Sequence, residues 1–304
     1  MFFDFFKTKP FETGYLPAQD GHQVFYQQFG NPKGTPVLYF HGGPGGSSKA
    51  SQAENFDLKR FRVILFDQRG SGKSSAEDAL YKNTTKETLE DALRLLEYLG
   101  VSDKIIVSGG SWGSSLALMF AENHPDKISK IVLCSVFLAR NRDRDWCNVD
   151  SVRFYPDIME ALQKPAGKEE VVSYYHDLIF SDDEEKQEEA LALYGQAERL
   201  LGKLNPAFKP AFRDDKAVQK LRIFMHYERN KHFIEENHIL KNIHKIKSIP
   251  MFIFHNRLDF CCPVEQAWEL HKSCPKSKLI VVPDKGHGSN RMFKVMKRFL
   301  KEEL

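Results

Sequence analysis

One serine in this chain stands where a nucleophile would be exposed. The segment GGSWG, residues 109–113, follows a β-rich run at 104–108 and precedes the helix-like sequence SSLALMFAE. Small residues on both sides of a serine permit the sharp strand-to-helix turn that presents its hydroxyl to a substrate. We therefore predict that Ser111 is a nucleophile. The competing interpretation is a glycine-rich turn that carries a structural serine.

A serine hydroxyl is a weak nucleophile near neutral pH, so Ser111 needs a base, and the base needs an orienting acid. Asp259 comes shortly after the apolar run Met251–His255, and His287 comes shortly after the apolar run Leu279–Val282. Loops at the carboxyl ends of parallel strands are where such sheets place their sites. The order serine, acid, histidine is also the one that accompanies a G-x-S-x-G turn. We predict that His287 is the general base and then the general acid, and that Asp259 fixes its imidazole tautomer.

A glycine-rich segment could hold the negative charge that develops on a carbonyl oxygen under attack. The sequence HGGPGG, residues 41–46, directly follows the apolar run Pro36–Phe40. Glycines leave backbone N–H groups free to face an oxyanion, and the second donor is expected to be the N–H of the residue after the nucleophile. We predict that Gly43 and Trp112 supply these two donors.

The remaining pattern predicts a mostly parallel sheet with helices on both faces. Continuous apolar runs indicate strands that are buried on both sides, and between two of them the capping box Thr84-x-x-Glu87 starts an amphipathic helix that Gly100 ends. Strands that alternate with helices form parallel βαβ units. Together with the serine turn, this order predicts an α/β-hydrolase fold. The runs expected to be strands are Gln23–Phe29, Pro36–Phe40, Val63–Phe66, Ile105–Ser108, Ile131–Cys134, Met251–His255 and Leu279–Val282.

Between residues 140 and 247 the sequence changes character. Charge-dense helical segments such as Ser181–Ala190 appear there, and no comparably β-rich run interrupts them. Alternation of β-rich and helical patterns then resumes. We therefore divide the chain into a first core part, 1–139, an inserted α-helical cap, 140–247, and a second core part, 248–304.

The composition excludes several classes of protein. The 304 residues suffice for one large domain with an insertion, and 41% hydrophobic with 28% charged residues is ordinary globular composition. The 44 Lys and Arg against 41 Asp and Glu leave a net charge of +3, which argues against a nucleic-acid binder. No apolar stretch approaches the roughly 18 residues that cross a bilayer.

The cysteines and histidines do not form a recognised ligand pattern. The five cysteines are odd in number and contain no CxxC pair, so we expect a reducing compartment, the cytoplasm. The chain contains no HExxH, and its four regularly spaced histidines recur at six-residue intervals that do not share a helical face. We therefore expect neither a metal nor a cofactor. The residues are Cys134, Cys147, Cys261, Cys262 and Cys274, and His226, His232, His238 and His244.

A possible phosphate-binding loop also fails. Gly72-Lys73-Ser74 follows a β-rich run, but the P-loop pattern needs glycine at position 67, where this chain has Asp67.

The chain resembles the proline iminopeptidases, α/β hydrolases that remove N-terminal proline from peptides. The matching stretches are DGHQVFYQQFGNPKGTPVLYFHGGPGG, FDQRGSGKSS, GGSWGSSLAL, CCPVEQAWELH and VPDKGHG, which cover the α/β body. HGGPG together with DQRGSG and GGSWGS is far more specific than G-x-S-x-G alone. The resemblance implies a cytoplasmic serine exopeptidase that uses no cofactor, has an α-helical cap over its active site, and acts on small peptides with a free N-terminal proline.

The resemblance also implies residues that bind the substrate. Family members use cap carboxylates to bind the α-ammonium group, because a cation brought into a shielded pocket must be paired. By position in the cap, Glu198 in YGQAERL and Glu228 in HYERNKHF match those acids, and Phe137 in SVFLAR matches an aromatic residue beside the proline ring. An apolar pocket of limited width would favour a pyrrolidine ring over a long side chain.

Departures from the family pattern keep other functions open. The tryptophans typical of the family are absent around Glu198, and HNRLD, with Asn256 and Leu258, replaces the usual HGRYD. The main alternative is a broader-specificity aminopeptidase or amidase, or a carboxylesterase of the same fold. A third interpretation is a hydrolase-fold binding module without catalytic activity. The sequence does not predict an oligomeric state.

Overall fold

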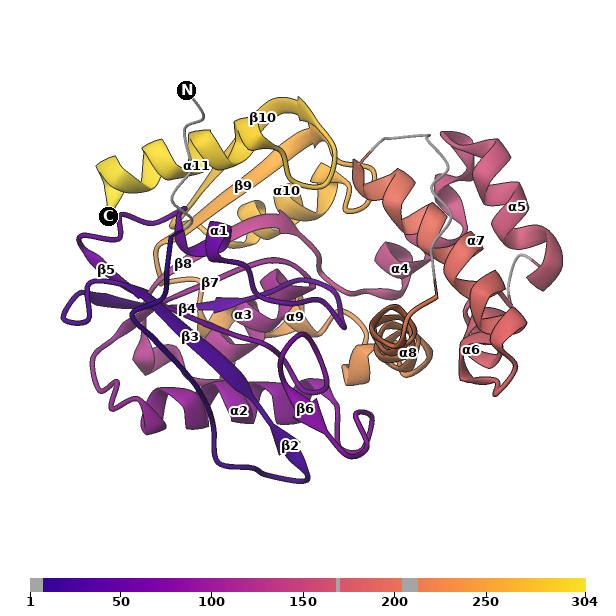
Figure 1. The fold of residues 1–304 in the computed structure, drawn as a ribbon. Coiled ribbons are helices and arrows are strands. Elements are labelled where there is room, and N and C mark those ends of the chain that lie inside the picture. Colours follow the sequence, from indigo (N-terminus) through magenta and orange to yellow (C-terminus); the bar gives the residue numbers. More distant parts are fainter. Residues whose placement is uncertain (1–7, 168–169, 204–212) are drawn as a thin grey trace, which may run out of the picture.

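The computed structural model describes residues 8–167, 170–203 and 213–304 of the chain. Its centre is an eight-stranded sheet with the order β1-β3-β5-β4-β7-β8-β9-β10 (Figure 1). The strands are β1 (Glu12–Tyr15), β3 (Phe25–Gly30), β4 (Thr35–Phe40), β5 (Phe61–Phe66), β7 (Ile105–Ser111), β8 (Ile128–Val136), β9 (Met251–Leu258) and β10 (Ser277–Lys285). A two-stranded sheet is formed by β2 (His22–Gln23) and β6 (Ser75–Ala76).

The predicted parallel sheet is confirmed from β5 onward. β1 and β3 are antiparallel to their neighbours, whereas β5, β4, β7, β8, β9 and β10 pair in parallel. Each of the seven runs expected from the sequence overlaps one of these strands. The strands at the site are longer than the apolar runs, because β7 and β9 continue through polar residues. This extension brings the end of β9 to the residue before Asp259.

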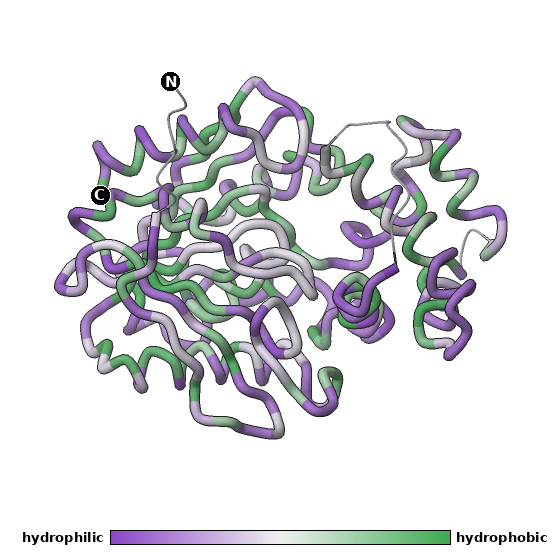
Figure 2. Tube along the Cα trace, in the orientation of Figure 1, coloured by the Kyte–Doolittle hydropathy of each residue, from purple (hydrophilic) through white to green (hydrophobic). Residues whose placement is uncertain are grey.

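Helices cover both faces of the sheet, as predicted. Helices α1 (Ala50–Ala53) and α11 (Asn290–Glu303) contribute to one buried cluster with residues of the sheet. A second cluster contains side chains of α2 (Thr85–Tyr98), α3 (Trp112–Asn123), α9 (His238–Asn242) and α10 (Val264–Ser273). Figure 2 shows hydrophobic residues along the central strands and alternation with hydrophilic residues along the outer helices. The two apolar faces therefore hold the sheet as a rigid support for the loops at its end.

Helix α2 begins after Thr84, as predicted, although the contacts of the Thr84 side chain differ from those of a capping box. Thr84 is the N-cap residue with an extended backbone, but its hydroxyl bonds to the Glu87 carboxylate and not to a backbone N–H. Gly100 follows the helix with φ +64°, a conformation that favours glycine.

Most helices of the inserted segment lie together at one end of the sheet (Figure 1). They are α4 (Asn141–Asn148), α5 (Pro156–Ala166), α6 (Val171–Phe180), α7 (Glu184–Lys203) and α8 (Asp215–Arg229). Helices α5 to α8 share a separate buried cluster that includes Tyr175 and Met225. The cap was expected to continue to residue 247. Ile239 and Ile246, near the end of that segment, pack into the main core. Within the described residues, none of the helices combines the length and the apolar character of a bilayer span.

We expect the packing behind the serine turn to tolerate no added carbon. A Cβ on Gly113, in the first turn of α3, would lie 2.1 Å from the carbonyl oxygen of Phe40 on β4. Gly113→Ala should therefore lower the free energy of unfolding by about 1–3 kcal/mol in urea denaturation. Gly202→Ala is the matched control, because its Cβ would meet only His287 Cβ at 3.9 Å and alanine favours a helix. Unchanged stability of Gly113→Ala would contradict the close approach of α3 to β4.

Candidate functional site

Ser111 lies at the junction of β7 and α3. Its backbone has φ +57° and ψ −133°, a strained conformation for a residue with a side chain. The turn requires glycine at position 109, because the backbone at Gly113 passes very close to it: a Cβ on Gly109 would lie 2.0 Å from the carbonyl oxygen of Gly113. The strain projects the hydroxyl beyond the end of the sheet, as the G-x-S-x-G pattern predicts.

Asp259 and His287 are brought together from the ends of β9 and β10. His287 Nδ1 lies 2.9 Å from Asp259 Oδ2 and 3.2 Å from Oδ1. A carboxylate can only accept a hydrogen bond, so the imidazole carries its proton on Nδ1. In that tautomer Nε2 is the free basic nitrogen, which is the orientation that a general base requires.

The Asp259 carboxylate is almost fully buried and held by its own loop. Oδ1 accepts hydrogen bonds from the backbone N–H groups of Cys261, at 3.0 Å, and Cys262, at 2.9 Å. His255 Nε2 lies 3.5 Å from Oδ2 but donates to the Cys262 carbonyl at 2.7 Å, while its Nδ1 accepts from the Val136 N–H at 3.2 Å. His255 is therefore a neutral, buried support of this loop, and burial lowers its pKa.

The electrostatics of the site act on His287. Burial alone lowers its pKa, but the negative charges of Asp259 and Cys261 raise it by more, so the pKa lies above the usual histidine value. The pKa of Cys261 is well below that of an ordinary thiol, because the neighbouring thiols of Cys147 and Cys262 stabilise its thiolate form. His287 is therefore a stronger base than a solvent-exposed histidine.

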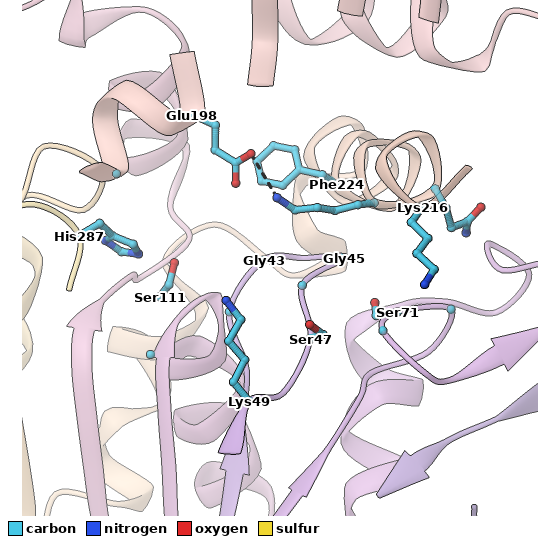
Figure 3. A pocket seen from close by; sticks show the side chains of 18 of the residues that line it. Gly43, Gly45, Ser47, Lys49, Ser71, Ser111, Glu198, Lys216, Phe224 and His287 are labelled. Carbon is cyan, nitrogen blue, oxygen red and sulfur yellow. Dashed lines mark hydrogen bonds and ion pairs between the residues drawn. The ribbon is translucent and has the colours of Figure 1, made fainter. Parts of the chain in front are cut away.

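A cavity of about 1110 Å³ lies between the sheet end and the helices α7 and α8, and Ser111 and His287 both line it. Figure 3 shows the two side chains facing the same space. No hydrogen bond links Ser111 Oγ to His287 in the part of the chain that the structure describes. Catalytic hydrogen bonds are often long without substrate and shorten in the complex, so the absence of this bond in the free protein is compatible with proton transfer from Ser111 to His287.

The glycine-rich loop after β4 lies against Ser111. A Cβ on Gly42 would lie 3.1 Å from Ser111 Cβ, and Gly43 has φ +137°. His41 Nδ1 donates to the Gly42 carbonyl at 2.8 Å, because its Nε2 already accepts from the Gln68 N–H at 3.0 Å. A carbonyl and the next N–H belong to one peptide plane, so His41 orients the Gly43 N–H.

Trp112, the other predicted oxyanion donor, is the first residue of α3. N–H groups in the first turn of a helix lack an intrahelical acceptor. The indole side chain is 1% exposed and packs against His232, with ring centroids 4.7 Å apart. Trp112 can thus offer its backbone N–H to the cavity side while its side chain anchors the turn.

The cap helices contact the loops that carry Asp259 and His287. The carbonyl of Gly202, near the end of α7, accepts the His287 backbone N–H at 2.7 Å. From α4, Trp146 Nε1 donates to the Phe260 carbonyl at 2.8 Å and Cys147 Sγ donates to the Cys261 carbonyl at 3.2 Å. The positions of both loops therefore depend on the cap as well as on the sheet.

Glu198 is one of the two predicted ammonium-binding acids, and it lines the cavity. Its Oε2 lies 3.5 Å from Lys220 Nζ of α8, and both side chains are partly exposed. Figure 3 shows Glu198 across the open space from Ser111 and His287. An ammonium group thus already lies beside the carboxylate without a substrate.

Glu228, the second predicted acid, is placed differently from the prediction. It is not among the described residues that line the cavity. Its side chain is 5% exposed, with Oε2 3.4 Å from Arg144 Nε and Oε1 3.6 Å from His232 Nε2. Burial raises its pKa, and Arg144 opposes that rise. Four residues earlier on α8, Phe224 lines the cavity in its stead.

Phe137 is likewise absent from the described lining. It is 8% exposed and packs on His232, with ring centroids 5.6 Å apart, while its backbone N–H donates to Ser114 Oγ at 3.0 Å. It therefore supports the helix behind the serine turn from within the core.

Several residues at the site were not assigned from the sequence. Asn256, noted only as a departure in HNRLD, is fully buried and donates from Nδ2 to the Gly286 carbonyl at 2.8 Å, which ties β9 to the His287 loop. Asp67, which ruled out a P-loop, accepts from the Ser48 N–H at 2.7 Å and fixes the end of the HGGPGG segment. The loops that carry the motifs HGGPGG and DQRGSG thus bond to each other, through His41 and Gln68 as well as through Ser48 and Asp67.

Comparison with known proteins gives consistent results. A family model described as the alpha/beta hydrolase fold matches residues 35–290. A probable proline iminopeptidase of Leptolyngbya boryana is 38% identical over 288 residues, 91% of this chain and 89% of that protein. A proline iminopeptidase of Arabidopsis thaliana is 38% identical over 291 residues, 93% of this chain and 76% of that protein. Among solved structures, a hydrolase from Pseudomonas aeruginosa has a TM-score of 0.64 at 16% identity, over 96% of this chain and 98% of that one.

We expect the pKa of His287 to fall when either neighbouring negative charge is removed. Asp259→Asn and Cys261→Ser should each move the NMR titration of the His287 ring to lower pH, because the protonated ring loses a stabilising anion. Asp284→Asn is the control, since that carboxyl lies on β10 and its contacts are with Ser289 and Lys285. A His287 titration that is the same in wild type and Asp259→Asn would contradict the electrostatic coupling.

Proposed function

We propose that this chain, which belongs to the proline iminopeptidases within the α/β hydrolases, is a serine exopeptidase that releases N-terminal proline from small peptides. The family resemblance seen in the sequence is confirmed by relatives that align over nine-tenths of the chain. The observation that carries the proposal is the strained Ser111 turn opening into the same cavity as the Asp259-bonded His287. Five free cysteines fit a reducing compartment, so we place the activity in the cytoplasm.

The proposed reaction has two stages. Ser111 Oγ attacks the carbonyl carbon of the N-terminal proline while His287 Nε2 takes the hydroxyl proton. The N–H groups of Gly43 and Trp112 hold the oxyanion, and loss of one such donor typically costs about 10²–10³ in rate. His287 then protonates the departing amine, which leaves an acyl-enzyme. Water deprotonated by His287 hydrolyses this ester and restores the serine.

Glu198 is the proposed binding group for the substrate's α-ammonium. It is the member of the predicted acid pair that reaches the cavity, and Lys220 Nζ lies beside it as a substrate ammonium would. A substrate must therefore displace Lys220 from Glu198 to make the same contact. Phe224 offers an apolar surface in the same cavity.

This arrangement also favours the second candidate function, a broader-specificity aminopeptidase or amidase or a carboxylesterase. One exposed carboxylate that is shared with a lysine discriminates weakly between free and blocked amino groups, because exposed ion pairs contribute about 0–1 kcal/mol. A panel of prolyl, alanyl and N-blocked prolyl arylamides with a simple ester separates the two functions. Hydrolysis of the blocked substrate at the rate of the free one would favour the broader enzyme.

We expect Ser111→Ala to lower kcat on a prolyl arylamide by roughly 10⁴-fold or more, because the acyl-enzyme can no longer form. Ser47→Ala, on the same cavity wall, is the matched control and should keep near-normal turnover. Labelling of Ser111 by a fluorophosphonate, located by peptide mass spectrometry, tests the nucleophile directly. Retained turnover in Ser111→Ala would refute the mechanism, and absence of labelling would favour a binding module without activity.

We expect opposite effects at the two ends of the Glu198–Lys220 pair. Glu198→Gln should raise KM for a prolyl arylamide several-fold, since about 1 kcal/mol corresponds to a factor of about five. Lys220→Met should lower KM, because the substrate ammonium no longer competes with a lysine. Steady-state kinetics on free and N-blocked prolyl arylamides measure both. If Glu198→Gln raised KM equally for the blocked substrate, Glu198 would not be reading the ammonium group.

A further inference from the structure

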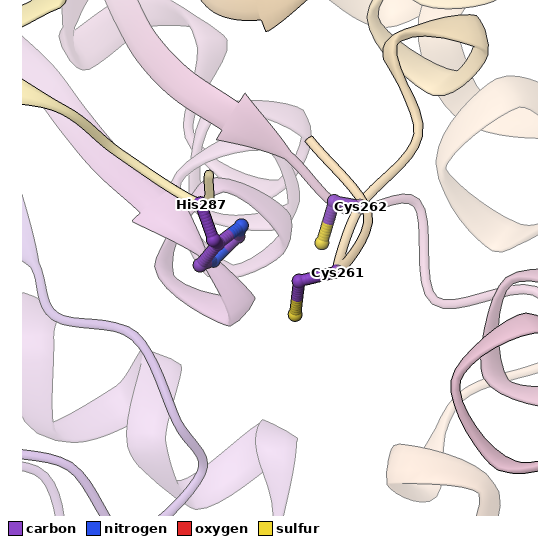
Figure 4. A group of neighbouring side chains, drawn as sticks. All are labelled: Cys261, Cys262 and His287. Carbon is purple, nitrogen blue, oxygen red and sulfur yellow. The ribbon is translucent and has the colours of Figure 1, made fainter. Parts of the chain in front are cut away.

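Two cysteines and the histidine of the site bring three metal-binding atoms together. We propose that Cys261 Sγ, Cys262 Sγ and a ring nitrogen of His287 form a binding site for a thiophilic divalent ion such as Zn²⁺, and that the ion withdraws His287 from Ser111. Each of the three ligand atoms lies within 4.8 Å of the other two (Figure 4). Thiolate and imidazole are the ligands that Zn²⁺ prefers in proteins.

The spacing suits a tetrahedral ion after a small adjustment. With Zn–S near 2.3 Å and Zn–N near 2.0 Å, tetrahedral ligands lie about 3.3–3.8 Å from one another. Atoms within 4.8 Å of one another must therefore approach by at most about 1.5 Å, which side-chain rotations of the two cysteines can supply. Two thiolates also neutralise the charge of a divalent ion, so that the filled site adds no net charge.

The Asp259 carboxylate already organises all three ligands. Its Oδ2 accepts from His287 Nδ1, and its Oδ1 accepts from the backbone N–H groups of Cys261 and Cys262. Because Nδ1 is held by the carboxylate, Nε2 is the nitrogen left for the ion. A carboxylate behind a metal-bound imidazole is the usual arrangement at zinc sites, and it fixes both the tautomer and the ring orientation.

The site is open to the cavity. Cys261 and His287 line it, whereas Cys262 is buried beneath them with 2% exposure. An ion can therefore enter from the cavity and keep one coordination position for water. Cys147 also lines the cavity, but its thiol donates to the Cys261 carbonyl and stands outside the group of three.

A bound ion would inhibit the hydrolase, because it would occupy the same nitrogen of His287 that serves Ser111. This consequence rests on the proposed function. Nε2 would be both the ligand of the ion and the acceptor of the Ser111 proton, so the two uses exclude each other. The ion would block the base reversibly, and a chelator would restore it. The expectation of no metal considered only ligands at regular sequence spacing, whereas His287 reaches the two cysteines through the fold.

Binding is tested with Cd²⁺, which reports thiolate ligation through an ultraviolet charge-transfer band. We expect wild type, kept reduced with a non-thiol reductant, to bind one Cd²⁺ per chain with this band, and EDTA to remove it. Cys261→Ser and Cys262→Ser should each lower the Cd²⁺ affinity at least tenfold, and the double variant should lose the band. Cys274→Ser, a buried cysteine at the end of α10, is the control and should bind as wild type does. His287→Gln should keep the band but bind at least tenfold more weakly.

Zn²⁺ inhibition of prolyl arylamide hydrolysis is the second measurement. Wild type should be inhibited and recover with EDTA, whereas Cys261→Ser should resist inhibition. Circular dichroism shows whether each variant is folded. Absence of the Cd²⁺ band in wild type, or equal binding by the folded double variant, would overturn the site. A protein that binds Cd²⁺ as expected but has no arylamidase activity would instead count against the proposed function.

Discussion

The Asp259 carboxylate is buried at the end of β9, where an anion needs several hydrogen-bond donors to remain charged. Its loop supplies two backbone N–H groups, from Cys261 and Cys262, and His287 supplies a third donor across the sheet end. This one interaction sets the tautomer of the imidazole, raises its pKa and fixes where Nε2 points. The same bonds also determine where the two cysteine side chains leave the backbone, so the acid organises the neighbouring thiols as well as the base.

The sheet makes this interaction possible by aligning strand ends. β9 and β10 are parallel neighbours, so the loops that follow them meet at one edge. β7 lies two strands from β9, with β8 between them, and ends at Ser111, while β4 beside it leads into the HGGPGG segment. The close approach of α3 to β4 at Gly113 holds these two loops together. Strand order and backbone packing therefore place Ser111 and the glycine-rich loop, whereas the loops that carry Asp259 and His287 are held by the cap as well as by the sheet.

The cap has a different physical role, because it shapes the cavity and contacts the loops from above. Helices α5 to α8 share a separate apolar cluster, and α7 contacts the site through the backbone bond from the His287 N–H to the Gly202 carbonyl and through Glu198 in the cavity lining. On α8 the side chains at positions 224 and 228 face different surroundings: Phe224 faces the cavity, and Glu228 faces Arg144 in the interior. The cavity under this cap therefore carries charges of both signs, because Glu198 and Lys220 line it as a pair and Lys49, Lys216, Glu77 and Asp215 also belong to the lining.

How much could be predicted from the sequence differs between the core and the cap. The strands, the serine turn, the order Ser111, Asp259, His287 and the glycine-rich loop follow from local patterns, because apolar runs, glycines and strand-to-helix turns are encoded within a few residues. The bond between Asp259 and His287 was an expectation, and the structure shows its geometry.

Glu228 was matched to a substrate-binding acid by the family resemblance and its position in the cap. Helical periodicity does not state which face of α8 meets the cavity, and Phe224, not Glu228, is among the described lining residues. The approach of Cys261 and Cys262 to His287, and the pairing of Lys220 with Glu198, join segments that are distant in sequence. By itself the sequence determined the core elements and the chemical types of the residues at the strand ends. Only the tertiary structure decided which charges and thiols share the cavity, because contacts between separate helices and loops depend on packing angles that no local pattern encodes.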